Sequence, residues 1–284
     1  MSANFLSQSE RPIDQLIERI EDVAVLPHVV YKVLELSAST DTAATELEQT
    51  IVVDPGFSTR ILALANSAFY GLPKRVTSIR EAVAFLGYKQ IRQMAMTVGF
   101  FDMFVGKNDR ESLRRRAWWR HSIDAAICCR WLAGESRKLP QEEAYTCGLL
   151  HYIGKPLMDR HVPGGYERVE QLVMTTAYSE LEAEHQVFGG DHIEVAIAAC
   201  TKWRLPESLV AALSYHDVPT TESLNPAGSA CVALGSAIAC SAVDGPGTIL
   251  PTWALTMLGF AVDQAEDLQE RAVAKIAASR SLQL

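Results

Sequence analysis

Several protein classes are excluded by what this 284-residue sequence lacks. Its six cysteines form no Cys-x-x-Cys pair and no short Cys/His run, so neither a zinc finger nor a disulfide framework is predicted. Residues 1–14 contain no basic segment followed by an apolar run of the kind that directs secretion. We therefore expect a cytoplasmic protein that folds on its hydrophobic core without cross-links.

Basic charge is also scarce, because 26 Lys and Arg stand against 34 Asp and Glu, which gives a formal net charge of −8. This balance argues against a nucleic-acid-binding surface spread over the whole molecule. Long apolar runs are missing as well. One of the most apolar stretches, residues 230–243, is shorter than the ~20 residues that span a bilayer, so it predicts a buried helix and no membrane insertion.

Helical periodicity is what the sequence does contain. Apolar residues recur at i, i+3, i+4 and i+7 from Ile13, from Ile79 and from Ile91, and a similar stripe runs from Ala265 to Ile276. No stretch shows sustained period-two alternation between hairpin turns. The fold class is therefore predicted to be all-α, a multi-helix bundle.

Local signals mark several helix ends. Asp54 followed by Pro55 is typical of a helix start, and Ser78 with Glu81 has capping-box spacing. Gly87 is placed to end the helix that Ser78 begins, in a left-handed turn. We expect a boundary near residues 106–110, which divides the chain into a helical N-terminal part, 11–108, and a C-terminal bundle, 109–284.

Four histidines recur along the predicted helices, at His121, His151, His192 and His216. His216 continues an apolar stripe and should point inward, while His151 lies within the apolar run from Gly148 to Lys155. For any one histidine, a hydrogen-bonded core position is the commoner role. Spacing alone therefore does not define a site.

The segment from Gly148 to Lys155 resembles the Gly-Leu-Leu-His-Asp-Ile-Gly-Lys motif of the HD superfamily of metal-dependent phosphohydrolases. More of the chain, about residues 20–220, is similar to the HDOD family, the HD-related output domain of bacterial signal transduction. The similar segments are Leu26-Pro27, Val53 to Gly56, Leu64 to Gly71, Ile79 to Gly87, Glu184, Phe188-Gly189, Asp191-His192, Trp203 to Pro206 and Tyr215-His216.

The resemblance implies a site that has lost its metal-binding carboxylates. In catalytic HD proteins, histidines, a His-Asp doublet and a late aspartate bind one or two divalent cations. The matching positions here are His121, the doublet His151-Tyr152, His192 and His216, and the late aspartate falls near Gly235-Ser236. Tyr152 and residues 235–236 supply no carboxylate. Asp124, three residues after His121, is a candidate for orienting that imidazole from behind the site.

Hydrolytic metal chemistry needs a cation that lowers the pKa of a bound water, and hard cations favour oxygen ligands. We therefore expect no catalytic residue and no cofactor, although four imidazoles could still hold a residual divalent metal in a closed site. The resemblance implies a regulatory output or interaction module that binds a signalling protein or a small ligand. The alternative is a metal-dependent phosphohydrolase acting on a nucleotide or cyclic dinucleotide.

The densest basic cluster surrounds Trp118 and Trp119. Such a mixture of cations and aromatic rings can bind phosphates and stack on bases, which makes it a candidate anion patch. The simpler interpretation is a solvated helix face whose tryptophans enter the core. The arginines of this cluster are Arg114, Arg115, Arg116 and Arg120.

Overall fold

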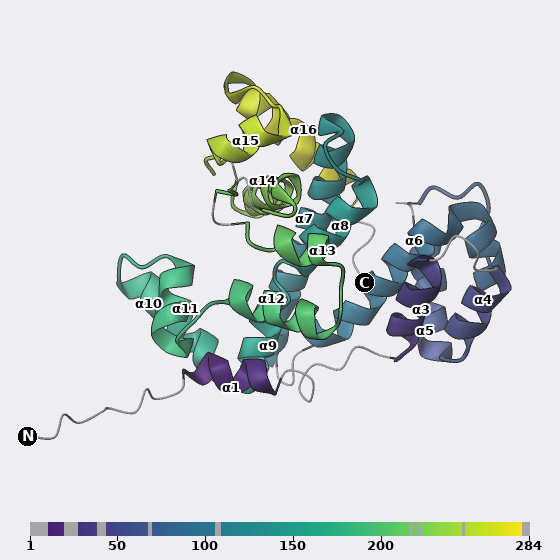
Figure 1. Cartoon of the computed structure of the whole chain (residues 1–284), viewed down its shortest axis with the longest axis horizontal. Coiled ribbons are helices and arrows are strands. Elements are labelled where there is room, and N and C mark those ends of the chain that lie inside the picture. Colours follow the sequence, from purple (N-terminus) through teal and green to yellow (C-terminus); the bar gives the residue numbers. More distant parts are fainter. Residues whose placement is uncertain are drawn as a thin grey trace, which may run out of the picture.

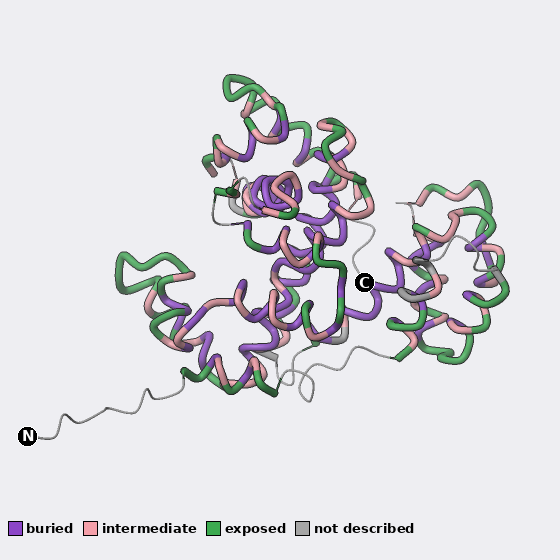
Figure 2. Tube along the Cα trace, viewed as in Figure 1, coloured by how far each residue is buried: buried purple, intermediate pink, exposed green. Residues whose placement is uncertain are grey.

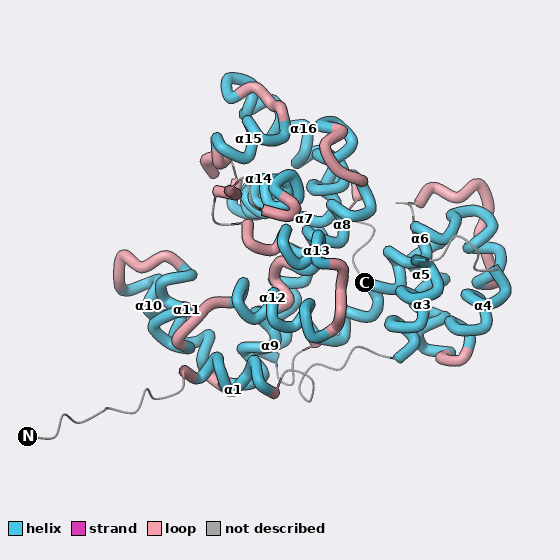
Figure 3. The backbone as a smooth tube through the Cα atoms, in the orientation of Figure 1, coloured by secondary structure: helices cyan, strands magenta, loops and turns pink. Residues whose placement is uncertain are grey.

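The computed structural model describes residues 11–19, 28–38, 44–67, 70–105, 109–215, 218–220, 223–245 and 248–279. Within these ranges the chain consists of helices and connecting loops, and none of these residues forms a strand (Figures 1 and 3). The predicted all-α class is confirmed. Figure 2 shows that the helix sides facing inward are buried while outer turns and loops are exposed.

One group of helices lies at the right of Figure 1 and is formed by the N-terminal part of the chain. Its members are α3 (His28–Ala38), α4 (Ala44–Val52), α5 (Pro55–Ala65) and α6 (Ile79–Phe101). Asp54 caps α5 as predicted, because its carboxylate accepts a hydrogen bond from the backbone N–H of Phe57 at 2.9 Å.

The predicted capping box at Ser78 and the predicted helix end at Gly87 both differ in detail from the prediction. Ser78 accepts a hydrogen bond from the backbone of Glu81, but the Glu81 carboxylate accepts one from the backbone N–H of Thr77 and not from that of Ser78. Gly87 does interrupt the helical backbone, with φ of 77° and ψ of 168°. Since helical structure resumes at once, the interruption is a kink within α6.

Asn66 lies in the segment Leu64 to Gly71, one of those that resemble the family, and its side chain holds a loop in place. Its Oδ1 atom accepts a hydrogen bond from the backbone N–H of Val76 at 2.8 Å, while Nδ2 donates to the carbonyls of Leu62 and Val76. An aspartate or serine could not make all three contacts. Asn66 thereby fixes the path of the chain between α5 and α6.

The C-terminal part surrounds two long helices, α7 (Asp109–Ser136) and α14 (Pro226–Asp244), which pack against each other. Around them lie η1 (Asp102–Phe104), α8 (Gln141–Leu150), α9 (Gly154–His161), α10 (Gly165–Thr175), α11 (Glu180–Phe188), α12 (His192–Lys202), α13 (Glu207–Ala212), α15 (Thr252–Leu258), η2 (Val262–Gln264) and α16 (Ala265–Ala278).

Helix α14 includes the one window, among the described residues, that is long and apolar enough to cross a membrane. That window, residues 226–243, is 61% buried inside the protein. Because α14 packs against α7, α8, α13, α15 and α16, its apolar composition is explained by its place in the core.

The first helix, α1 (Pro12–Glu18), departs from the expected division of the chain at residues 106–110. It packs against α9 and α12 of the C-terminal part, below them in Figure 1, rather than against α3 to α6. Arg11 donates a hydrogen bond to the carbonyl of Gly189, and Lys202 donates one to the carbonyl of Glu18. The sequence signal for α1 was correct, but its partners lie far along the chain: Gly189 is 178 residues after Arg11, and Lys202 is 184 residues after Glu18.

Candidate functional site

Two glycines of the His151 segment allow the helices that carry the histidines to approach closely. A Cβ atom at Gly154 would lie 1.9 Å from the carbonyl oxygen of His192, and one at Gly148 would lie 2.8 Å from the Cα of Ala126. Both distances are shorter than any real Cβ contact, so only glycine fits. The glycines of the motif therefore place His151 against α7 and beside the start of α12.

The same crowding exists on α14. A Cβ atom at Gly235 would lie 2.4 Å from the Cys129 sulfur, whereas the next residue, Ser236, points its hydroxyl at His121, 3.1 Å from Nε2. Of the two positions where the family's late aspartate was expected, only 236 therefore faces the histidines.

The imidazoles of His121 and His151 contact each other. Their Nε2 atoms are 3.1 Å apart, and Nδ1 of His151 donates to the carbonyl of Gly148 at 2.6 Å. Since His151 carries its proton on Nδ1, its Nε2 accepts from the Nε2–H of His121. The remaining Nδ1 of His121 is then free to accept from the thiol of Cys240, 3.9 Å away. The two rings thus form a neutral, internally satisfied chain of hydrogen bonds.

Burial supports this neutral state. His121 is 9% exposed and His151 is 0% exposed. Burial, together with the nearby positive charge of Lys155, lowers the pKa of His121 to about 3. Burial and the neighbouring His121 hold the pKa of His151 well below its usual value. Both imidazoles remain neutral at physiological pH.

Tyr152, which stands where the family has aspartate, fills the space beside these rings. Its own ring stacks on His121, with centroids 4.3 Å apart and planes inclined by 20°, and lies 4.2 Å from His151. The ammonium of Lys155 lies 4.0 Å from the centre of the Tyr152 ring. This is a cation–π contact in a buried setting, where such contacts are strongest.

Lys155 is 1% exposed, and its charge is balanced by Glu180, whose carboxylate is 2.6 Å from the ammonium. The positively charged side chain of Lys155 therefore lies beside the doublet His151-Tyr152. A signal for it is present in the sequence, because Lys155 is part of the motif and lies three residues beyond Tyr152. Its partner Glu180 begins another helix and could not be paired with it by spacing.

His192 has a separate set of partners. Its Nδ1 lies 2.7 Å from the carboxylate of Glu184, which also accepts from the backbone N–H of His192 and from the hydroxyl of Tyr166. Burial opposes ionisation of Glu184, but His192 and Lys155 outweigh it and lower its pKa to about 2. The Nε2 atom of His192 faces the hydroxyl of Tyr215 at 3.4 Å. His192 is thus oriented toward the site by a buried carboxylate.

These groups open into a cavity of about 430 Å³, which we call the histidine pocket. It lies between the start of α11, α14 and the segment that leads into α15. Its wall is mostly apolar and aromatic, with a few polar groups, as is usual in small-molecule sites. The lining residues are Tyr152, Ser179, Glu180, Leu181, His192, Tyr215, Ala233, Ser236, Ala237, Cys240, Pro251 and Trp253.

The structure thus brings together His121, His151, Tyr152 and His192, while His216 lies outside the described residues. Asp124 is buried on α7, but the His121 nitrogens face His151, Ser236 and Cys240, which orient the ring instead. Sequence reasoning missed Cys240, although it lies one helical turn beyond Ser236 and hence on the same face.

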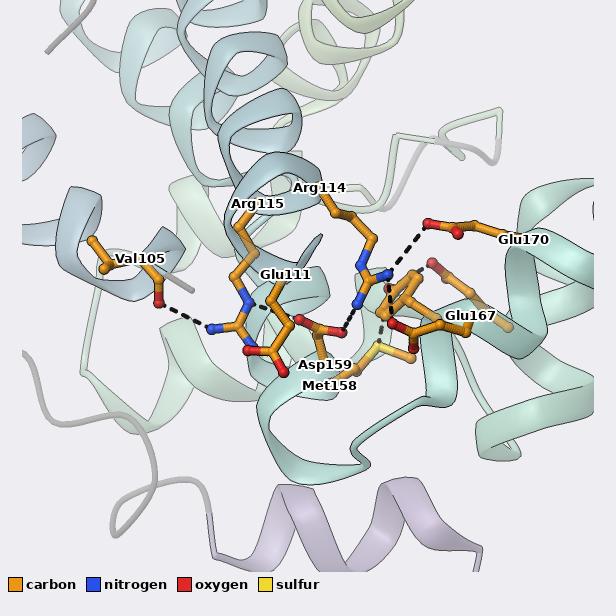
Figure 4. Close-up of polar contacts among 10 residues, drawn as sticks. Val105, Glu111, Arg114, Arg115, Met158, Asp159, Glu167 and Glu170 are labelled. Atoms are coloured by element: carbon orange, nitrogen blue, oxygen red, sulfur yellow. Dashed lines mark hydrogen bonds and ion pairs between the residues drawn. The ribbon is translucent and has the colours of Figure 1, made fainter. Parts of the chain in front are cut away.

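The four arginines do not form one anion patch, which corrects that expectation. Figure 4 shows two of them, Arg114 and Arg115, turned toward Asp159. Arg115 donates to Asp159 at 2.7 Å and to the carbonyl of Val105, and its side chain is 1% exposed. Arg114 donates to the other oxygen of Asp159 at 2.7 Å and also pairs with Glu167. Their charges are already neutralised inside the protein. Arg116 and Arg120 are exposed, and the rings of Trp118 and Trp119 are buried.

The residues present do not fit a hydrolytic cation. Such a site needs deprotonated oxygen ligands and an open position for water. Here the doublet supplies a buried tyrosine whose pKa is raised well above its usual value by burial, and a lysine ammonium lies beside it. Repulsion from this ammonium would oppose a second cation at the same place.

An all-α domain with converging, HD-type histidines and without the accompanying carboxylates defines the class. The model of the HDOD domain family matches residues 23–219, and the chain belongs to this family. An uncharacterized protein of Treponema pallidum (strain Nichols) is 24% identical over an alignment of 222 residues that covers 74% of this chain. The match spans only 40% of that longer relative.

Solved structures share the fold. An HDOD domain protein of Geobacter sulfurreducens has a TM-score of 0.75 at 24% identity, covering 94% of this chain and 97% of that one. A candidate phosphohydrolase of Shewanella amazonensis SB2B has a TM-score of 0.73 at 22% identity, with the same coverage. A candidate signal-transduction protein of Marinobacter aquaeolei VT8 reaches 0.73 at 20% identity, covering 96% of this chain and 65% of that one.

Proposed function

We propose that this chain is a non-catalytic signal-transduction domain that binds a small ligand in the histidine pocket. One observation carries the proposal, namely that a cluster of buried side chains opens into a cavity of about 430 Å³. In this cluster the imidazoles of His121 and His151 are hydrogen-bonded to each other, and the Tyr152 ring stacks on His121. Lys155 supplies a positive charge beside the Tyr152 ring. A cavity of this volume lies within the range of ligand sites. The name of the Marinobacter relative points the same way.

Cys240 provides a direct test, because it lines this pocket and is partly exposed, whereas the other five cysteines are buried. Iodoacetamide should therefore alkylate Cys240 first. A ligand in the pocket should protect it, and protection can be measured by mass spectrometry against a panel of nucleotides, cyclic dinucleotides and fractionated bacterial metabolites.

A matched variant identifies the site of protection. Ser236→Trp should fill the pocket and abolish ligand binding, whereas Thr256→Trp, on the exposed side of α15, should leave it unchanged. Protection that persists in Ser236→Trp would contradict the proposal.

The name of the Shewanella relative favours the second candidate, a phosphohydrolase. It predicts turnover of a nucleotide or a cyclic dinucleotide with added Mn²⁺. We expect no turnover above the blank. Turnover that is lost in His151→Ala would overturn the non-catalytic proposal, because His151 lies at the centre of the site.

A further inference from the structure

A second cavity lies outside the family match, between the end of α14, the segment 248–252, η2 and α16. Its volume is about 790 Å³, and we call it the terminal pocket. Leu250, Leu255 and Val273 contribute apolar wall. At its base Gln269 donates to the hydroxyl of Ser241 at 2.6 Å, which holds α16 against α14.

The mouth of the terminal pocket is unusual in its exposure of apolar surface. Ile249 lines it and is 90% exposed, and Val262 lines it and is 50% exposed. A branched apolar side chain gains free energy when it is removed from water. An occupant with an apolar body would cover both.

Charge at the mouth is of one sign. Glu266 and Glu270 line the pocket one helical turn apart on the same face of α16, and like charges at this spacing repel. Within the described chain neither carboxylate forms an ion pair, whereas their neighbour Asp267 pairs with Arg271 at 3.5 Å. The described lining contains no lysine or arginine. A positively charged group at the mouth would relieve the repulsion.

We propose that the terminal pocket is a second binding site, and that its ligand is a small amphiphilic cation with an apolar chain or ring and an ammonium group. The apolar part lies against Leu250, Leu255 and Val273, and the ammonium lies between Glu266 and Glu270. The argument for this site does not rest on the function proposed for the histidine pocket.

Isothermal titration calorimetry of the full chain with octylamine, octanoate and octanol tests the proposal. All three share the same apolar chain and differ in the charge of the head group. Octylamine should bind about tenfold more tightly than octanoate, with octanol between them. Equal binding of octylamine and octanoate would overturn the proposal, because the carboxylates would then have no role.

Variants locate the site. Glu270→Gln should weaken the binding of octylamine about threefold. Asp267→Asn removes the same charge from the same helix outside the pocket and should leave octylamine binding unchanged. Ala265→Trp and Val273→Trp should each fill the cavity and abolish binding, and thermal melting would show that they fold. Octylamine binding that survives both filled variants would contradict the proposal.

The competing occupant is a second copy of this chain. Sedimentation velocity over a range of concentrations distinguishes it. Dimerisation that Val273→Trp abolishes would show that the terminal pocket is an interface, and the cation proposal would fail. A chain that remains monomeric and binds octylamine would support the cation proposal.

Discussion

The ammonium of Lys155 lies 4.0 Å from the centre of the Tyr152 ring, and the His121 imidazole stacks on that ring at 4.3 Å. Tyr152 therefore does more than replace the aspartate that the family has at this position, because its ring makes contacts of its own. Its ring contacts both a buried cation and a neutral imidazole, and its electron-rich face stabilises the cation.

This arrangement predicts how Tyr152 variants behave. Tyr152→Ala should reduce the free energy of unfolding by about 3 kcal/mol, because it removes the ring contacts and leaves a cavity. Tyr152→Phe keeps the ring and should cost less than about 1 kcal/mol. Urea denaturation measures both. An equal loss in the two variants would mean that the hydroxyl, and not the ring, stabilises the site.

The buried imidazoles predict a pH dependence. The pKa of His121 is about 3 in the folded protein, and that of His151 is also depressed, whereas unfolded histidine titrates near ~6.5. The unfolded chain therefore binds more protons as the pH falls below about 6.5, and folding is destabilised there. His121 should contribute about 1.4 kcal/mol per pH unit between about pH 6 and pH 4, and His151 acts in the same direction.

Denaturation at several pH values checks this slope. His121→Gln should reduce it, because one of the two imidazoles is gone. His185→Gln is the control, since the His185 side chain is 47% exposed and lies outside the cluster. A slope that is unchanged in His121→Gln would contradict the assignment.

The close approach at Gly154 predicts that even one methyl group is too large. Gly154→Ala should lower stability by about 3 kcal/mol or prevent folding, because the new Cβ would meet the carbonyl of His192 at 1.9 Å. Gly56→Ala is the matched control, since its Cβ would meet nothing closer than 3.4 Å. Thermal melting compares them. An intact Gly154→Ala protein would show that α9 and α12 can move apart.

The ion pairs of Figure 4 predict a strong dependence on Asp159. Asp159→Ala leaves Arg114 and Arg115 without their shared buried partner, and removing one member of a buried pair costs about 3–5 kcal/mol. The exposed pair of Arg271 and Glu135 is the comparison, and Arg271→Ala should change stability little. Chemical denaturation tests both. Similar losses would mean that burial does not set the strength of these pairs.

The two pockets share a wall, which predicts coupling. Leu250 and Thr252 line the terminal pocket, while Pro251 and Trp253 line the histidine pocket. Octylamine in the terminal pocket should hold this segment and slow alkylation of Cys240. Ala265→Trp should abolish the effect. Unchanged alkylation at saturating octylamine would show that the wall is rigid.

The sequence predicted the helices and the histidines of the site for different reasons. Apolar periodicity and the Asp54 cap are local, so α1, α5 and α16 followed from the chain itself. The positions of His121, His151 and His192 followed from resemblance to a family.

What failed was the identity of charge partners. Arg114 and Arg115 were predicted to lie on a basic surface because their helix is rich in arginine. Their partner Asp159 lies 45 and 44 residues further along the chain, too far away to be paired with them by spacing. Lys155 likewise pairs with Glu180 across two helices. Periodicity reports which face of a helix a residue occupies but not what packs against that face.

Gly235 and Ser236 together limit where a metal-binding carboxylate could be introduced into this domain. A carboxylate side chain at 235 would collide with Cys129 on α7, so close packing rules out a substitution at this position. Position 236 faces the histidines, because the Ser236 hydroxyl lies 3.1 Å from Nε2 of His121, so a carboxylate introduced there would lie beside that imidazole. Until Tyr152 also changed, such a carboxylate would have a lysine ammonium, and not a metal ion, as its nearby source of positive charge.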